Sequence, residues 1–155
     1  MDLKIWYIVP DMKVKFQTSA GGIVYKKEGD EVLWLITQHS QHKGWTFPKG
    51  LVGDKNKNEN EETAALREVE EEGGVKVKIV NPQPLTASYA FKLDGFLIKK
   101  TVYYYLMEYI SGDPKDHDWE VSEAKFITAE EMRKLLSFKK DKDAFEKILL
   151  KLKNA

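Results

Sequence analysis

Short apolar runs separated by turn residues predict several β-strands along the chain. Two pairs of such runs predict hairpins: residues 23–25 and 31–38 around Gly29-Asp30, and residues 86–91 and 96–110 around Asp94-Gly95. An Asp-Gly pair between two β-rich runs is a strong short-range hairpin signal. Residues 75–80 alternate apolar and polar side chains, which predicts another strand, and a shorter one is expected around residues 125–127.

Three other segments have helical spacing. Within residues 59–75, Ala65, Leu66 and Val69 form an apolar stripe, and the Gly-Gly pair at 73–74 is typical of a helix end. Residues 128–131 have the spacing of a capping box, which predicts a helix running to residue 136. Apolar residues at helical spacing in 145–152 predict a last helix that packs on one side.

Composition narrows the class of protein. The chain has 155 residues, 42% of them hydrophobic, enough for one domain with a substantial core, and we assign residues 15–155 to it. Residues 1–14 are expected to be an additional strand or an arm. Formal net charge is zero, so no long nucleic acid is expected as partner. The absence of cysteine excludes disulfides and a thiolate nucleophile. No signal peptide or membrane span is evident, so we expect a cytoplasmic protein.

The helix predicted in residues 59–75 places three carboxylates together. Glu68, Glu71 and Glu72 share one face at i, i+3 and i+4 spacing, near the negative end of the helix dipole. Repulsion between the carboxylates and their unfavourable interaction with the helix dipole both oppose folding, so a cation is expected to offset them. Mg²⁺ prefers carboxylate and water oxygens and fits this description, which indicates a phosphate-handling site. A solvated acidic face is the alternative.

The same segment resembles the signature of the Nudix family. That signature is a glycine, five residues, a glutamate, seven residues, and then Arg-Glu-aliphatic-x-Glu-Glu-x-Gly-aliphatic. Its fixed positions are filled by Gly53, Glu59, Arg67, Glu68, Glu71, Glu72, Gly74 and Val75. Relatives commonly carry Pro-Lys-Gly as the start of the signature, which here makes Gly50 the alternative first glycine. We favour Gly50, with a longer loop before the helix.

Further segments narrow the resemblance to one subfamily. Residues 100–107, 119–126 and 136–141 are similar to segments of the asymmetrically cleaving bis(5′-nucleosyl)-tetraphosphatases. The resemblance implies an α/β (α+β) fold, an α/β/α sandwich with a mixed β-sheet, a Glu-rich catalytic helix and C-terminal helices. It also implies Mg²⁺-dependent attack of water on phosphorus, giving ATP and AMP from diadenosine tetraphosphate. The alternatives are another Nudix pyrophosphatase, acting on ADP-ribose, a nucleoside triphosphate or an RNA 5′-end, and a non-catalytic module that binds nucleotides.

The resemblance also assigns roles to individual residues. It implies that Glu68, Glu71 and Glu72 hold Mg²⁺ (Mn²⁺ being possible), with Glu120 and the carbonyl of Gly50 as further ligands. The general base is Glu68 or Glu120, a choice that the sequence leaves open. Arg67 is expected to orient or neutralise one of the carboxylates. Glu59 is expected to support the start of the helix.

Basic and aromatic residues are candidates for binding a dinucleoside polyphosphate. Lys49 and Lys100 are candidate phosphate contacts, and His42 is a weaker one. Any of Tyr89, Tyr103 and Tyr105 could stack on adenine, because an aromatic ring accepts different bases. The ordinary alternatives are surface lysines and core tyrosines. Whether the protein is a monomer or a homodimer stays open.

Overall fold

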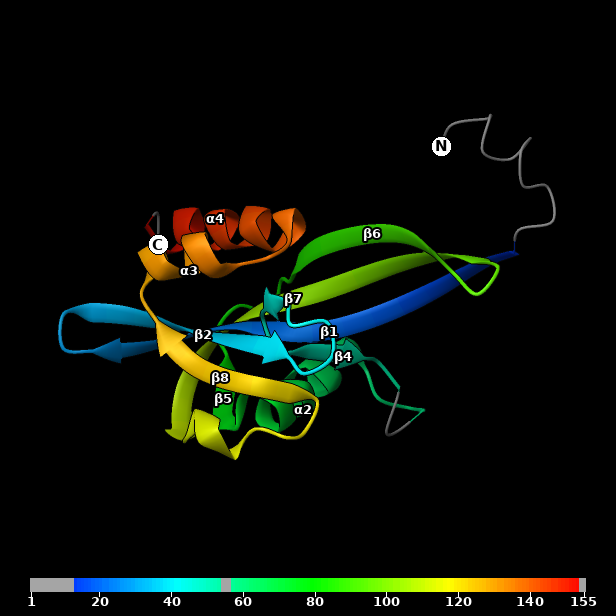
Figure 1. Ribbon diagram of the computed structural model, residues 1–155. Coiled ribbons are helices and arrows are strands. Elements are labelled where there is room, and N and C mark those ends of the chain that lie inside the picture. The colour runs from blue at the N-terminus through cyan, green and yellow to red at the C-terminus, as the bar shows by residue number, and fades with distance from the viewer. Residues whose placement is uncertain (1–12, 54–56, 154–155) are drawn as a thin grey trace.

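The computed structural model describes residues 13–53 and 57–153, in which a mixed sheet separates two helical layers (Figure 1). The strands are β1 (Lys13–Glu28), β2 (Glu31–His39), β3 (Trp45–Thr46), β4 (Lys49–Leu51), β5 (Val75–Ile79), β6 (Leu85–Leu93), β7 (Phe96–Gly112) and β8 (Val121–Ile127). The helices are α2 (Glu61–Gly73), α3 (Ala129–Leu135) and α4 (Lys139–Lys153), with a 3-10 turn at Pro114–Asp116. This arrangement confirms the α/β/α sandwich.

The long strands β1 and β7 form the centre of the sheet. They run parallel, from Lys13 paired with Phe96 to Tyr25 paired with Glu108. All other pairings are antiparallel among the described residues: β2 and β4 pair with β1, β5 and β6 with β7, and β3 and β8 with β2. The two predicted hairpins are confirmed as β1–β2 and β6–β7. The single parallel pairing makes the sheet mixed.

Each face of the sheet has its own hydrophobic core. On one face, Met132, Phe145 and Ile148 from α3 and α4 pack against Trp34 and Tyr104 of the sheet. On the other face α2 packs through a second cluster, which contains Ala64, Ala65, Val69, Val75, Tyr105 and Met107. The predicted stripe of α2 therefore faces the sheet, with Leu66 at its edge, where it is only partly buried. The same helix holds Glu68 and Glu72 against β4, where they meet Gly50 and the Lys49 backbone.

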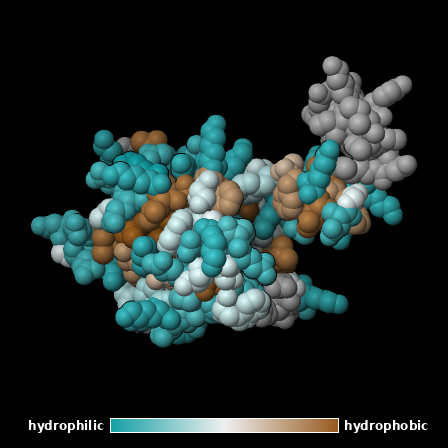
Figure 2. Space-filling view, viewed as in Figure 1, coloured by the Kyte–Doolittle hydropathy of each residue, from teal (hydrophilic) through white to brown (hydrophobic). Residues whose placement is uncertain are grey.

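The N-terminal part of the domain differs from the expectation. Residues 1–12 lie outside the described part of the chain, whereas Lys13 and Val14, assigned to the predicted arm, already belong to β1. At this end β1, β6 and β7 extend past the helices, and apolar surface is visible there (Figure 2). Phe16 and Leu93, on these strands, are 77% and 53% exposed. None of the described helices has the length and apolar character needed to cross a membrane.

Candidate active site

Helix α2 is fixed at both ends by capping interactions. The Asn60 side chain accepts a hydrogen bond from the Thr63 N–H (2.8 Å), which satisfies one of the free donors of the first turn. At the other end Gly74 has φ 72°, a left-handed conformation that suits glycine, and its N–H donates to the Glu70 carbonyl. These caps set the start and the end of the helix that carries the acidic residues.

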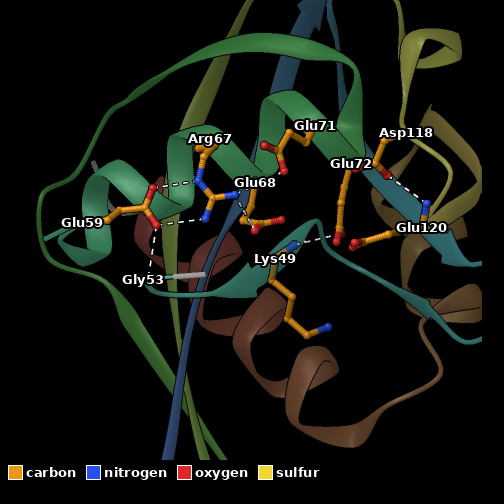
Figure 3. Close-up of polar contacts among 9 residues, drawn as sticks. All are labelled: Lys49, Gly53, Glu59, Arg67, Glu68, Glu71, Glu72, Asp118 and Glu120. Carbon is orange, nitrogen blue, oxygen red and sulfur yellow. Dashed lines mark hydrogen bonds and ion pairs between the residues drawn. The ribbon is translucent and has the colours of Figure 1, made fainter. Parts of the chain in front are cut away.

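Arg67 joins the loop before α2 to two acidic residues of the helix (Figure 3). Its guanidinium donates to both oxygens of Glu59, at 2.7 Å from Nε and 2.9 Å from Nη2. Nη1 donates to Glu68 at 2.9 Å and to Glu71 at 3.2 Å. Arg67 thus contacts three acidic side chains, Glu59, Glu68 and Glu71. The hydrogen bonds from Arg67 hold the pKa of Glu59 below its ordinary value, so Glu59 stays ionised beneath the loop.

Glu68 and Glu72 are buried acids at the inner end of the site, only 4% and 8% exposed. Burial raises the pKa of Glu68 to about 7, although Arg67 opposes the shift. Burial raises the pKa of Glu72 to about 8, against the hydrogen bond that Glu72 Oε1 accepts from the Lys49 N–H (3.2 Å). The charges of Glu71 and Glu120 raise the pKa of Glu68 further, and the charge of Glu68 raises the pKa of Glu72 further. Desolvation is therefore the main reason why these acids resist ionisation.

A cleft of about 360 Å³ brings these acids together with most of the predicted site residues. Its lining has an acidic side, Glu68, Glu72 and Glu120, and a basic side, Lys49 and Lys100. The other lining residues come from β2, β3, β4 and β8 and from the turn after β2, which carries His42: Thr37, His39, His42, Thr46, Gly50, Leu51 and Val121. Residues more than eighty positions apart in the sequence thus meet at one site. Glu71 lies beside the cleft and pairs with Arg67.

The two candidate glycines have different surroundings. A Cβ atom at Gly50 would overlap the Glu68 carboxylate, so any other residue at this position would displace that carboxylate. Gly53, with φ 81°, donates its N–H to Glu59 Oε1 (3.3 Å). Gly50 is therefore adjacent to the carboxylates of the cleft, and Gly53 belongs to the loop that Arg67 and Glu59 hold.

A second hollow, of about 710 Å³, adjoins the cleft and shares His42, Lys49 and Lys100 with it. Its walls add aromatic side chains and a short loop: Lys43, Gly44, Tyr89, Phe91, Ser137 and Phe138. His42 stacks on His39, with ring centroids 4.0 Å apart, and meets Phe138 edge-on. Phe91 and Phe138 were not predicted from the sequence, since single apolar residues near a strand end and before a helix have no distinctive spacing.

Two of the predicted stacking residues lie on the wrong side of the sheet. Tyr105 is buried in the cluster under α2, and Tyr103 packs against the same cluster. Tyr104, on the opposite side of β7, is buried under α4. The prediction of Tyr103 and Tyr105 as cleft residues is therefore corrected. Of the three candidates, Tyr89 alone lines either hollow.

Lys100 is a partly buried cation on β7. Burial lowers its pKa, the neighbouring charge of Lys49 lowers it further, and the charges of Glu72 and Asp141 oppose the shift. A cation that is short of solvent and close to a second cation favours a nearby anion. Lys49 and Lys100 together therefore suit a phosphate chain.

The residues of the cleft have the chemistry for a hard divalent cation. In the described part of the chain, no three acidic or histidine side chains are gathered closely enough to form a closed metal cage. Arg67 contacts one oxygen each of Glu68 and Glu71. Mg²⁺ in proteins usually keeps several waters and takes one or two carboxylates, so a closed cage is not required. Buried carboxylates beside a backbone glycine fit such an ion.

The fold and the cleft define an α/β/α protein with a carboxylate-lined site. The chain belongs to the Nudix family, since the NUDIX domain profile matches residues 15–148. The relatives that it matches include a Nudix hydrolase, and its structural neighbours include an Ap4A hydrolase.

Two curated relatives match most of this chain but only part of their own length. A protein designated mutator protein MutT4, from Mycobacterium tuberculosis, is 31% identical over 133 residues, 82% of this chain and 52% of that protein. Nudix hydrolase 6 from Arabidopsis thaliana is 34% identical over 116 residues, 72% of this chain and 38% of that protein. The chain thus spans about half, or less, of these relatives.

Two solved structures share the fold over nearly their whole length. The C. elegans Ap4A hydrolase binary complex has a TM-score of 0.75 and 24% identity, covering 90% of this chain and 99% of that one. The NUDIX domain of Shewanella oneidensis NrtR, complexed with ADP ribose, has a TM-score of 0.67 and 17% identity, covering 98% and 99%. At these identities the similarity establishes the architecture.

Proposed function

We propose that this Nudix hydrolase cleaves diadenosine tetraphosphate to ATP and AMP in the presence of Mg²⁺. The observation that carries the proposal is the cleft with Glu68 and Glu72 on one side and Lys49 and Lys100 on the other. A polyphosphate chain needs cations along its length and a site for hydrolysis at one phosphorus. The segment 100–107, which resembles the tetraphosphatases, contributes Lys100 to this cleft.

The phosphate chain would lie along the basic side of the cleft. Lys49 and Lys100 line both hollows, so an extended anion between them contacts the same two cations. His42 lies at the same boundary and is a third candidate contact. Lysine binds phosphate as a mobile point charge, which tolerates the changes in geometry during cleavage.

Attack of water on phosphorus would take place on the acidic side. Mg²⁺ held by Glu68, Glu71 and Glu72, with Glu120 and the Gly50 carbonyl as further ligands, would neutralise phosphate charge there. The attacking water forms the new P–O bond while the anhydride bond breaks. Its proton passes to Glu68 or Glu120, both of which line the cleft. Arg67 would keep Glu68 and Glu71 in position.

The aromatic hollow suits one nucleoside of the substrate. Tyr89, Phe91 and Phe138 supply aromatic surface beside the two lysines. Stacking of a base on such a ring is worth roughly 1 to 3 kcal/mol. A substrate with its phosphates in the cleft and a base in this hollow would occupy both cavities, which inorganic polyphosphate cannot do.

Product analysis tests the proposal. The protein is incubated with Mg²⁺ and a panel of diadenosine tetraphosphate, ADP-ribose, nucleoside triphosphates and capped RNA, and the products are separated by chromatography. We expect the highest kcat/KM for diadenosine tetraphosphate, with ATP and AMP as the only products. Faster turnover of another substrate would refute the substrate assignment.

Two substitutions test the carboxylates themselves. Glu72→Gln is expected to lower kcat by at least about a hundredfold, because the amide is a weaker cation ligand. Glu70→Gln is the matched control on the same helix, since Glu70 is exposed and pairs with Lys76 at the surface. Unchanged turnover in Glu72→Gln would contradict the proposed metal site.

A further inference from the structure

Asp141 is a buried acid that the proposed reaction does not use. It lies in the first turn of α4 and is 0% exposed. Its carboxylate accepts three hydrogen bonds from hydroxyl groups: Thr46 Oγ1 at 2.7 Å, Tyr104 OH at 2.8 Å and Tyr89 OH at 2.9 Å. Three O–H donors replace the water that a buried carboxylate loses. Its sequence separation from the donors is between 37 and 95 positions, so Asp141 ties α4 to three separate parts of the sheet.

The bond to Thr46 determines how this threonine meets Lys49. A threonine hydroxyl has one proton, and here that proton is directed to Asp141 Oδ2. The lone pairs of Oγ1 are then left to accept, and the Lys49 ammonium donates to them at 2.9 Å. The carboxylate thus orders a chain of two hydrogen bonds that ends on a cation of the cleft.

The bond from Tyr89 determines the position of an aromatic ring in the second hollow. Tyr89 is paired directly with Lys100 across the β6–β7 ladder, so the two side chains lie on the same face of the sheet. The hydroxyl of Tyr89 is held by Asp141 under α4, the helix that covers this face (Figure 1). Asp141 therefore contacts both Thr46, which accepts a hydrogen bond from Lys49, and Tyr89, which lines the second hollow beside Lys100.

We propose that Asp141 is a positioning residue for substrate binding, which holds Lys49 through Thr46 and holds Tyr89 directly. The inference rests on the proposed function in one respect, that Lys49 contacts the phosphates. It assigns no chemical step to Asp141. It gives a role in binding to a carboxylate that is fully buried and holds hydroxyl donors from three strands.

Two substitutions separate positioning from simple stability. Thr46→Val keeps the shape of the side chain and removes the link between Asp141 and Lys49. Tyr104→Phe removes a hydrogen bond to the same carboxylate from a residue that lines neither hollow. We expect both to lower the melting temperature. Thr46→Val alone should raise KM, by about tenfold with kcat within about threefold, because it loosens a contact made in the ground state as well as the transition state.

Two further variants examine the path through Thr46. Thr46→Ser retains the hydroxyl and should restore KM to within about twofold of the unsubstituted protein. In a Lys49→Met background, Thr46→Val should have no additional effect on KM, because residues that act through one another are not additive. An equal rise of KM in Tyr104→Phe, or additive effects of Thr46→Val and Lys49→Met, would overturn the proposal.

Binding of inorganic tripolyphosphate, measured by calorimetry, distinguishes this proposal from the proposed function. If no substrate of the panel is turned over, the proposed function fails, and the tripolyphosphate dissociation constants still decide the role of Asp141. We expect Thr46→Val to weaken tripolyphosphate binding about tenfold, and Tyr104→Phe to leave it within about twofold. Equal binding by all three proteins, or no binding by the unsubstituted protein, would refute the positioning role.

Discussion

Replacing Glu72 by glutamine should stabilise the metal-free protein, and only at neutral to alkaline pH. Burial raises the pKa of Glu72 from 4.5 to about 8, so the folded chain holds this proton more tightly than the unfolded chain. The resulting stabilisation is complete below pH about 4.5 and is lost as the pH rises to about 8. Glutamine is permanently neutral, and its side-chain oxygen can still accept the Lys49 N–H. The substituted protein should therefore not show this loss.

The size of the effect follows from the same pKa. At about 1.4 kcal/mol for each factor of ten, ionising Glu72 at pH 8 costs the folded state up to about 4 kcal/mol. Glu68 raises the pKa of Glu72 and is itself buried, so removing one carboxylate relieves only part of the shared cost. We expect Glu72→Gln to increase the free energy of unfolding by about 2 kcal/mol at pH 8 and by less than about 0.5 kcal/mol at pH 5.

Urea unfolding in EDTA, at pH 5, 6, 7 and 8, measures this difference. The slope of the free energy of unfolding against urea concentration should be the same in both proteins, so that a shift of the unfolding midpoint reports a change in stability. Glu70→Gln is the control, because exposed ion pairs such as that of Glu70 with Lys76 contribute about 0 to 1 kcal/mol. A lower midpoint for Glu72→Gln at pH 8, or a gain of equal size at pH 5 and pH 8, would refute the argument from burial.

Three further predictions concern the same site. Mg²⁺ should raise the melting temperature of the unsubstituted protein in a concentration-dependent way and that of Glu72→Gln much less, as thermal scans would show. Arg67→Lys should lower the free energy of unfolding, measured by urea unfolding, by about 2 kcal/mol. Lysine keeps the charge but cannot form the bidentate ion pair with the buried Glu59 side chain. Gly50→Ala should lower kcat at least about tenfold, because the new Cβ displaces the Glu68 carboxylate, whereas circular dichroism should show a folded protein.

Features that depend on local spacing were predictable from the sequence. The two hairpins form where a Gly-Asp or an Asp-Gly pair interrupts β-rich runs, because a tight turn needs residues that tolerate positive φ. Gly29 and Asp94 both have a positive φ. Helix α2 ends at Gly73, one residue before the left-handed Gly74. The acids of α2 were found because i, i+3 and i+4 spacing is itself a statement about one helix face.

Features that depend on which side of the sheet a residue occupies were not predictable from the sequence. Strand alternation separates Tyr103 and Tyr105 from Tyr104, but it does not say which set faces the cleft. That choice is made by helices elsewhere in the chain: α2 covers the side of Tyr105, and α4 covers the side of Tyr104. Asp141 was hidden for a related reason. It lies among lysines, a pattern typical of a solvated helix face, and its three partners are distant in sequence.

The structure gives a different main reason from the sequence why the acidic residues of α2 oppose folding. Its sequence suggests that repulsion between Glu68, Glu71 and Glu72 opposes folding. In the structure Arg67 relieves Glu68 and Glu71, and desolvation is the first cause of the raised pKa of Glu68 and of Glu72. Burial excludes the water that would otherwise screen the two carboxylates, so a cation that enters the cleft interacts with them more strongly than it would at a surface. Glu68 and Glu72 destabilise the metal-free protein and are, for the same reason, well suited to bind a divalent ion.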